Sequence, residues 1–259
     1  MGNMNSKSFL YKLLKKMEII LYRHSELIVV LSKGCIDYVK KFGAREIEYF
    51  PNYANTDLFK YSLLPHEGEK FSSIRPFRII YSGSHGNAND LENVIKAAFY
   101  LQKLPIEIIF VGDGTQKENL KRLASNLDNI IFKNPVPKKN IPTLLSNFDA
   151  VLISLADIKL FEYGVSPNKL FDAYAVGRPV ITTIQGLVKD EVEEFNLGVT
   201  APPGNPWELS EAIKKLFEKN RNERIIMSLN CRNMVENYYS KDILLTKYAD
   251  RITKLINNY

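Results

Sequence analysis

The stretch SPNKLFDAYAVGRPVI, residues 166–181, combines the start of a helix with a cation at a defined position. Ser166 is a favoured helix N-cap and Pro167 suits the first helical position, so Lys169 falls in the first turn. The free N–H groups of that turn favour an anion. A cation there is unfavourable for the helix alone, so its presence predicts an external anion such as a phosphate.

An acid follows one turn further along the same helix. Asp172 comes three residues after Lys169 and four after Asn168, which places all three side chains on one helix face. A carboxylate repels a phosphate but accepts two hydrogen bonds from a vicinal diol such as ribose. Lysine on phosphate and acid on ribose describe a nucleotide site. The alternative is a solvated Lys–Asp pair, which contributes little to stability.

Glycines in two loops directly follow apolar stretches: Gly83 and Gly86 in SGSHGNAND, and Gly112 and Gly114 on either side of Asp113 in VGDGTQ. Glycine lets the backbone approach a ligand closely, and the helix behind the second loop offers its positive end. Both loops are also compatible with tight turns that bind nothing. The first loop lacks the GxGxxG spacing, so a dinucleotide fingerprint is not expected. His85 in this loop is either a surface histidine or a ligand contact.

These loops require strands to position them. Apolar stretches predict five strands, and helical patterns lie between them, which indicates an α/β fold with a parallel sheet covered on both faces, a Rossmann-like domain. The strands are expected at 77–83, 106–112, 129–133, 150–155 and 179–183, and the helices at about 89–102, 116–126, 139–147, 168–176 and 187–195. Ligands bind beyond the carboxyl ends of such strands, so we expect the loops named above to converge there.

The sequence predicts further segments on both sides of this sheet. Residues 7–22, 27–32, 34–43 and 47–50 read as helix, strand, helix and strand, and three helices are expected at about 206–219, 220–238 and 241–257. A Pro-, Asn- and Ser-rich stretch separates the two parts. We therefore expect an N-terminal remnant at 1–50, a linker at 51–75, a ligand-binding domain at 76–240 and a closing helix at 241–259.

Composition narrows the partners. The net charge of +6 favours anionic ligands, but the lysines are dispersed and no aromatic–basic motif suggests nucleic acid. Cys35 and Cys231 lack metal-ligand spacing, and His24, His66 and His85 are scattered, so we expect no metal site. The polar start MGNMNS and the lack of a spanning apolar run predict a cytoplasmic protein.

The helix at 7–22 has two interpretations. Its apolar stripe either packs on the protein core or, with Lys12, Lys15 and Lys16 beside it, contacts an acidic membrane. The second interpretation predicts a peripheral protein at the inner face of the plasma membrane.

Several segments together resemble bacterial family-four glycosyltransferases of the GT-B fold, of the type that acts in capsule and O-antigen biosynthesis. They are RIIYSGSHGN, FVGDGTQKENLKRL, NIIFKNPVPKKNIPTLLSNFDAVLISL and SPNKLFDAYAVGRPVI, in the family's order. The resemblance covers about 7–257 and corresponds to the C-terminal donor-binding half. It implies a retaining enzyme that transfers a sugar from a nucleotide diphosphate sugar, UDP-linked by expectation, to a glycan or lipid-linked acceptor, with no cofactor beyond this donor.

The resemblance also implies roles for individual residues. The first loop (Gly83, Ser84, His85, Gly86) and the second (Gly112, Asp113, Gly114) line the donor site, Pro135 and Val136 meet the nucleobase, Ser166, Asn168 and Lys169 meet the diphosphate, and Asp172 takes the ribose. The family often has two glutamates seven residues apart. The second aligns with Asp172, whereas the first falls at Gly164, and nearby Glu162 is the candidate substitute. Lys169 and Glu162 are therefore the candidate catalytic residues.

The resemblance implies that residues 1–50 are only the last helices and strands of the family's acceptor-binding half, and that the rest of that half has no counterpart in this sequence. Three explanations stay open: a fragment, a truncated gene product, or a split enzyme whose partner chain supplies the other half. A non-catalytic nucleotide-sugar-binding module is the alternative function. A sugar-nucleotide epimerase of the same fold is disfavoured, because it needs acids and histidines in both halves.

Overall fold

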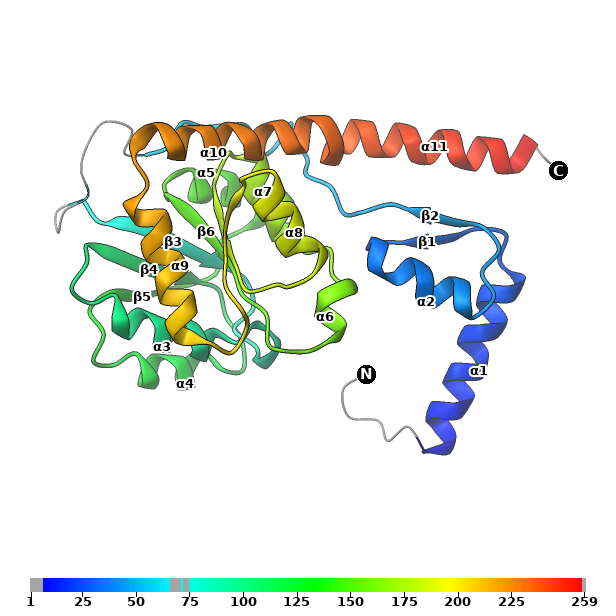
Figure 1. Cartoon of the computed structure of the whole chain (residues 1–259), viewed down its shortest axis with the longest axis horizontal. Coiled ribbons are helices and arrows are strands. Elements are labelled where there is room, and N and C mark those ends of the chain that lie inside the picture. The colour runs from blue at the N-terminus through cyan, green and yellow to red at the C-terminus, as the bar shows by residue number, and fades with distance from the viewer. Residues whose placement is uncertain (1–6, 66–70, 72–74, 258–259) are drawn as a thin grey trace. The chain divides into compact units, whose positions relative to one another are not determined.

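The computed structural model describes residues 7–65, 71 and 75–257 (Figure 1). The chain forms two compact units, one of residues 1–51 with 163–166 and one of residues 52–162 with 167–259. His66, part of the expected linker and the N-terminal MGNMNS lie outside the described residues.

The larger unit is built on a six-stranded sheet in which all neighbouring strands are parallel, in the order β5-β4-β3-β6-β7-β8. The strands are β3 Phe77–Ser82, β4 Ile106–Val111, β5 Ile130–Lys133, β6 Ala150–Ile153, β7 Val180–Thr182 and β8 Gly198–Thr200. The expected α/β class and the five expected strands are confirmed. The chain changes direction across the sheet between β3 and β6, which makes the loops after these two strands the switch point.

Strand β8 was not expected, because it is short and begins with a glycine. A Cβ at Gly198 would lie 1.9 Å from the carbonyl oxygen of Val180, so only glycine lets β8 lie this close to β7. Its sequence, GVT, has too few apolar residues to stand out as a strand.

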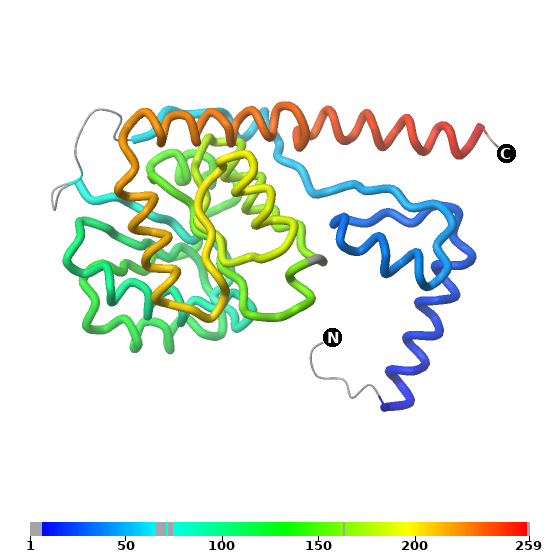
Figure 2. The backbone as a smooth tube through the Cα atoms, viewed as in Figure 1, coloured from blue at the N-terminus to red at the C-terminus, as the bar shows by residue number. Residues whose placement is uncertain are grey.

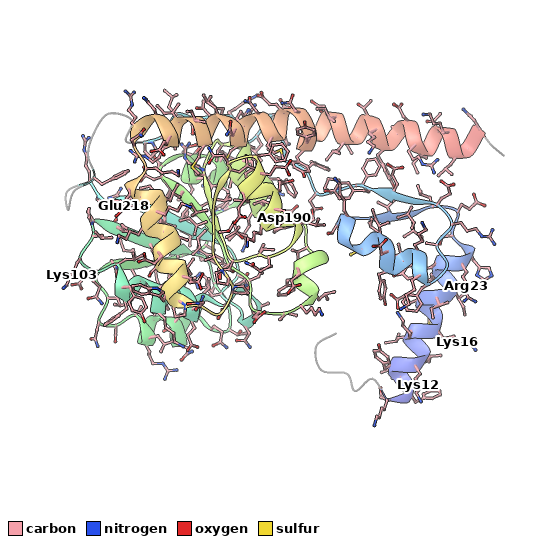
Figure 3. The ribbon with its side chains drawn as sticks, in the orientation of Figure 1. Lys12, Lys16, Arg23, Lys103, Asp190 and Glu218 are labelled. Atoms are coloured by element: carbon pink, nitrogen blue, oxygen red, sulfur yellow. The ribbon has the colours of Figure 1, made fainter. Side chains whose placement is uncertain are left out.

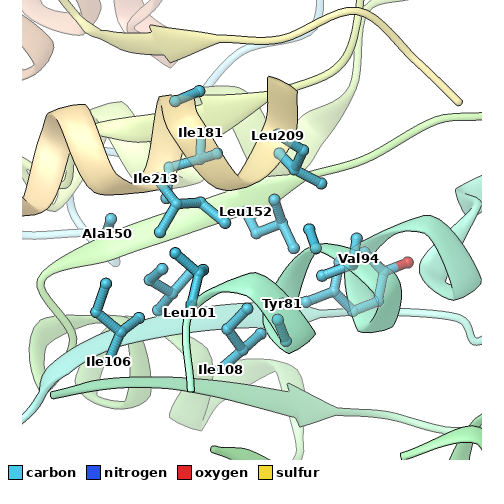
Figure 4. Close-up of a cluster of buried hydrophobic side chains, with 14 of the residues drawn as sticks. Tyr81, Val94, Leu101, Ile106, Ile108, Ala150, Leu152, Ile181, Leu209 and Ile213 are labelled. Carbon is cyan, nitrogen blue, oxygen red and sulfur yellow. The ribbon is translucent and has the colours of Figure 1, made fainter. Parts of the chain in front are cut away.

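Helices cover both faces of this sheet (Figure 2). The helices that follow β3 in the chain are α3 Leu91–Tyr100, α4 Lys117–Leu123, α5 Ile141–Ser146, α6 Leu160–Tyr163, α7 Asn168–Ala175, α8 Leu187–Glu194, α9 Pro206–Glu218, α10 Arg221–Met234 and α11 Lys241–Asn257, with short 3-10 turns at Asn87–Asn89 and Lys138–Asn140 and a π-helical turn at Val235–Tyr239. Apolar side chains of α3, α4 and α9 form one core cluster with β3, β4 and β6, including Tyr81, Val94, Leu152 and Ile213 (Figure 4).

Two details differ from the sequence-based expectation. Helix α6 was not expected, since the loop after β6 shows no helical pattern. Helix α7 begins at Asn168 with Pro167 at the cap position and no side-chain cap, so the prediction that Ser166 caps this helix is wrong. The extended backbone of Pro167 ends the loop one residue later than expected.

Residues 52–65 are held on the larger unit by two arginines. Fully buried Arg178 donates hydrogen bonds of 2.9 and 2.7 Å to the carbonyl and hydroxyl oxygens of Ser62. Arg232 donates a hydrogen bond of 3.0 Å to the carbonyl of Phe59. This stretch of the expected linker is therefore packed against the domain that follows it.

The smaller unit contains α1 Phe9–His24, β1 Ile28–Val30, a 3-10 turn at Lys33–Cys35, α2 Ile36–Lys41 and β2 Ile47–Tyr49, with β1 and β2 paired in parallel. Its buried apolar cluster consists of Val30, Val39 and Ala44. Helix α1 has no fully buried side chain, although Tyr22 packs against this cluster. Its apolar stripe, which includes Phe9 and Leu21, is exposed among the described residues, contrary to the expectation that the stripe packs on a core.

No helix among the described residues has the length and apolar character needed to cross a membrane.

Candidate functional site

Loops after three neighbouring strands meet around one pocket of about 300 Å³ at the carboxyl edge of the sheet. The lining includes six residues predicted from the sequence, Gly83, Ser84, Gly112, Asp113, Pro135 and Val136, together with Ser82, Val111, Lys138 and Ile141. In the sequence, the first and last of these residues, Ser82 and Ile141, are more than fifty positions apart. The parallel register of β3, β4 and β5 is what brings them together.

Lys169 reaches this pocket's first loop from α7. A Cβ at Gly83 would lie 2.4 Å from the Lys169 ammonium nitrogen, so a side chain at this position would displace the lysine from the loop. The ammonium lies 4.3 Å from the centre of the Tyr81 ring and donates a hydrogen bond of 3.1 Å to the Tyr81 hydroxyl. Tyr81 donates in turn to the carbonyl of Ser84, at 2.7 Å. A chain of contacts therefore joins α7 to the first loop across the switch point.

Lys169 has no anionic partner. Among the described residues it forms no ion pair with Asp172 or with any other carboxylate, so the solvated Lys–Asp pair considered above is not formed. Burial lowers the pKa of Lys169 to about 8, since a desolvated ammonium loses hydration. A half-buried cation without a counter-ion has lost part of its hydration, so binding an anion there is more favourable than binding one at a fully hydrated lysine.

Asp172 lies one turn further along α7 and is also half-buried. Burial raises the pKa of its carboxyl to about 6, and the positive charge of Lys138 partly opposes this effect. Lys138 also lines the pocket. Lys138 is therefore close both to Asp172 and to the pocket.

The glycines of the second loop, Gly112 and Gly114, let this loop pack closely against the first loop. A Cβ at Gly112 would lie 1.9 Å from the carbonyl oxygen of Gly83, and a Cβ at Gly114 would lie 2.6 Å from that of His85. The His85 amide donates a hydrogen bond of 2.8 Å to the carbonyl of Asp113. Close packing of two loops is enough to explain these two glycines, and their role toward a ligand stays a prediction.

His85 is fully buried, so the expectation of a surface histidine is wrong. Its ring packs about 6 Å, centre to centre, from the rings of Tyr81, Phe110 and Phe132. Both ring nitrogens lack a hydrogen-bond partner within the described part of the chain. Burial, then the charge of Lys117, lowers the pKa of His85, with a smaller opposing effect from a nearby acid. The imidazole does not line the pocket, and only the backbone of His85 shapes the loop.

Two lysines at the site were missed by the sequence analysis. Lys117 is buried and donates a hydrogen bond of 2.8 Å to the carbonyl of Gly112, which fixes the second loop. Lys138 lies at the pocket wall after β5. The segment NPVPKK, at a strand end and rich in cations, was the available signal for Lys138. Nothing local marks Lys117, whose role depends on the turn that it closes.

Eight predicted residues are not among those that line this pocket: His85, Gly86, Gly114, Glu162, Ser166, Asn168, Lys169 and Asp172. Gly86 borders a neighbouring hollow of about 100 Å³. Asn168 is exposed at the start of α7, and Ser166 groups with the smaller unit. Glu162 is half-buried in α6, where its carbonyl oxygen lies against Gly186; a Cβ there would come within 2.2 Å.

The site therefore combines an apolar wall, exposed backbone at two loops and two cations. Pro135, Val136 and Ile141 supply the apolar wall, and Lys138 and Lys169 supply the charge. The N-terminus of α7 adds its positive end. This arrangement suits a ligand with a flat apolar group and an anionic group.

Comparison with known proteins places the domain in a family. Residues 76–219 match the model of the glycosyl transferases group 1 family. The chain is 29% identical over 163 residues to WcaI of Escherichia coli K12, described as a colanic acid biosynthesis glycosyl transferase; the match spans 56% of this chain and 37% of that protein.

Solved structures show the same fold. HepE of Anabaena, solved with UDP-glucose, superposes with a TM-score of 0.75 at 18% identity, over 94% of this chain and 68% of that one. WaaG, a glycosyltransferase involved in lipopolysaccharide biosynthesis, gives a TM-score of 0.71 at 19% identity, over 97% and 70% of the two chains. The expected resemblance is confirmed: the chain belongs to the glycosyl transferases group 1 family, and its parallel sheet is one Rossmann-like half of a GT-B glycosyltransferase.

Proposed function

We propose that the larger unit binds a nucleotide diphosphate sugar, UDP-linked, and is the donor-binding half of a retaining glycosyltransferase. The acceptor is a glycan or a lipid-linked glycan of surface polysaccharide biosynthesis. The observation that carries the proposal is Lys169, a half-buried cation that reaches from the start of α7 to Gly83 and has no anionic partner in the part of the chain that the structure describes.

We assign a part of the donor to each part of the site. The nucleobase lies against Pro135 and Val136, the diphosphate meets Lys169 and the first turn of α7, and the ribose donates hydrogen bonds to Asp172. Support comes from HepE, which was solved with UDP-glucose, and from WcaI, which is named as a colanic acid biosynthesis glycosyl transferase.

The same groups assist the reaction. When the bond between the anomeric carbon and the phosphate oxygen breaks, negative charge grows on the departing diphosphate. Lys169 and the helix N-terminus stabilise that charge where it develops. The acceptor oxygen forms the new bond to the anomeric carbon and passes its proton to the departing diphosphate oxygen. Glu162 is proposed to contact the sugar from the loop after β6, and retention follows from the family resemblance.

Titration calorimetry with UDP tests the donor site. Lys169→Met should weaken binding by about tenfold or more, since it removes a charge-assisted hydrogen bond. Lys103→Met is the matched control, because Lys103 is an exposed lysine of the same unit (Figure 3), and its affinity should equal that of the unsubstituted chain. Equal affinity for all three proteins would remove the phosphate role of Lys169.

A second candidate function is a nucleotide-sugar-binding module, or one subunit of a split glycosyltransferase. The smaller unit favours it, since two paired strands and an uncovered α1 leave apolar surface for a partner polypeptide that supplies the acceptor half. UDP-sugar binding without transfer to any candidate acceptor supports the module. Transfer by the chain alone would contradict it.

We also propose that the protein is cytoplasmic and that α1 contacts the membrane surface. Exposed apolar residues such as Phe9, Leu10 and Leu21 share this helix with Lys12 and Lys16 (Figure 3). Sedimentation with anionic vesicles at low salt tests it, and a chain that stays in the supernatant would exclude the contact.

A further inference from the structure

The larger unit has a second pocket that shares no residue with the candidate donor site. It measures about 510 Å³ and lies among α3, α4 and the start of α9. Its floor contains Ile95, a buried core residue, and Leu127, which packs against the same core. A pocket of this size, mostly apolar with a few polar groups, is typical of a binding site.

Aromatic rings stand exposed at this pocket. Phe99 is 64% exposed and Tyr100 is 49% exposed, although both belong to a helix that covers the core. Trp207, 54% exposed, meets Tyr100 edge to face with ring centres 5.2 Å apart. A group of large exposed aromatic rings on a folded domain is typical of an interaction site.

The polar groups of the pocket are amides. Gln102 and Asn126 line it, and neither has a hydrogen-bond partner among the described residues. Each amide both donates and accepts, which suits hydroxyl groups. The charged lining residues Glu92 and Lys96 form an ion pair of 2.8 Å with each other, so they neutralise one another. The pocket therefore offers a phosphate no unpaired cation among these lining residues.

We infer that this pocket binds a neutral saccharide. A pyranose ring has an apolar C–H face, which packs on an aromatic ring, and a rim of hydroxyl groups, which pair with side-chain amides. Tyr100 offers the ring, and Gln102 and Asn126 offer the amides. An apolar peptide would use the rings but leave the amides unpaired, at a cost in free energy.

The inference stands on the pocket alone. Its connection with catalysis rests on the proposed function: a transferase that extends a glycan gains effective concentration when it holds a second part of that glycan. The donor site and this pocket can therefore be tested separately.

Trp207 provides the measurement, because it is the only tryptophan in the sequence. Titration with methyl α-glucoside, methyl α-galactoside and maltotetraose should change its emission in a saturable way for at least one sugar. Saturation-transfer NMR on the same sugars should show contact through ring C–H protons. No saturable response and no transfer for all three probes would overturn the inference.

Variants locate the binding. Tyr100→Ala should weaken the sugar about tenfold or more, and Gln102→Ala should weaken it several-fold. Tyr238→Ala is the matched control, because Tyr238 is 57% exposed on another element. Thermal melting checks that each variant is folded. Unchanged affinity in Tyr100→Ala would place the sugar elsewhere and overturn the inference.

Two further arms separate the interpretations. In Lys169→Met, sugar binding should persist while UDP binding weakens, so failure of one site does not imply failure of the other. An amphipathic leucine-rich peptide should not displace the sugar. Tight binding of that peptide at Tyr100 without any sugar response would instead show a protein docking face.

Discussion

The two units of this chain are built from the same kinds of elements but differ in how well these are covered. In the larger unit, strands such as β6 are buried along their whole length under helices on both faces. In the smaller unit, β1 and β2 pair only with each other among the described residues, and Val29 and Leu31 are exposed. Helix α1 has no fully buried side chain and packs only Tyr22 against the buried cluster of this unit. Apolar periodicity predicts an element equally well in both units. Whether that element is stable depends on the surface that covers it.

Hydrogen exchange should show this difference most strongly. Amides of β3 and β4 should exchange at least about a thousandfold more slowly than those of β1 and β2, because the former open only with the whole domain. Mass spectrometry of peptides from each strand measures this. Equal protection of the amides in both units would contradict this difference and show that the smaller unit has a stable core of its own.

Removing Arg178 should produce the next largest effect, confined to the larger unit. Arg178→Ala should lower its free energy of unfolding by about 3 kcal/mol or more, since the buried carbonyls of Val176 and Gly177 and several part-buried carbonyls lose a donor. Urea denaturation followed by Trp207 emission reports on this unit. Val39→Ala in the smaller unit is the control, and it should leave that transition unchanged. An unaltered midpoint in Arg178→Ala would mean that residues 52–65 are not needed for stability.

UDP affinity should be highest between about pH 6 and pH 8. Above about 8, Lys169 loses its proton and its charge, and below about 6, Asp172 gains a proton and loses an acceptor. Each limb should fall by up to about tenfold per pH unit. Lys169→Met should flatten the alkaline limb. Asp172→Asn should remove its share of the acid limb, leaving only the titration of the ligand phosphate near pH 6. Parallel profiles in all three proteins would exclude both roles.

His85 should have the smallest effect. Its pKa is lowered in the folded state, so its contribution to stability is complete above the ordinary value of 6.5 and is lost as the pH falls from there toward the lowered pKa. His85→Phe should remove this dependence and raise stability by up to about 1 kcal/mol, because two unpartnered ring nitrogens disappear. Denaturation at two pH values checks it. A dependence that persists in the variant would have another source.

The sequence predicted most of the sheet because five of its strands are continuous apolar runs. It missed β8, which pairs only because Gly198 admits Val180. It also misplaced the start of α7, since a serine before a proline resembles a cap but the extended backbone of Pro167 takes that position. In both cases a tertiary or backbone constraint decided the outcome over the local pattern.

The candidate site was predictable in outline. Strand ends in a parallel sheet share one edge, so the loops with Gly83, Gly112 and Pro135 were expected to meet, and they line one pocket. The environment of His85 was not predictable, because Phe110 and Phe132, which pack against it, come from other strands. The role of the loop residues Gly83, Gly112 and Pro135 in donor binding stays a prediction.

The contact between Lys169 and Gly83 also has a consequence for chemical reactivity. An amine with a pKa of about 8 is partly unprotonated near neutral pH, whereas ordinary lysines are almost fully charged. Lys169 should therefore react before the ordinary lysines with a small acylating reagent at low dose, and a bound diphosphate should shield it. An acylated Lys169 peptide, found by mass spectrometry without UDP and absent with it, would make this residue a reporter of occupancy.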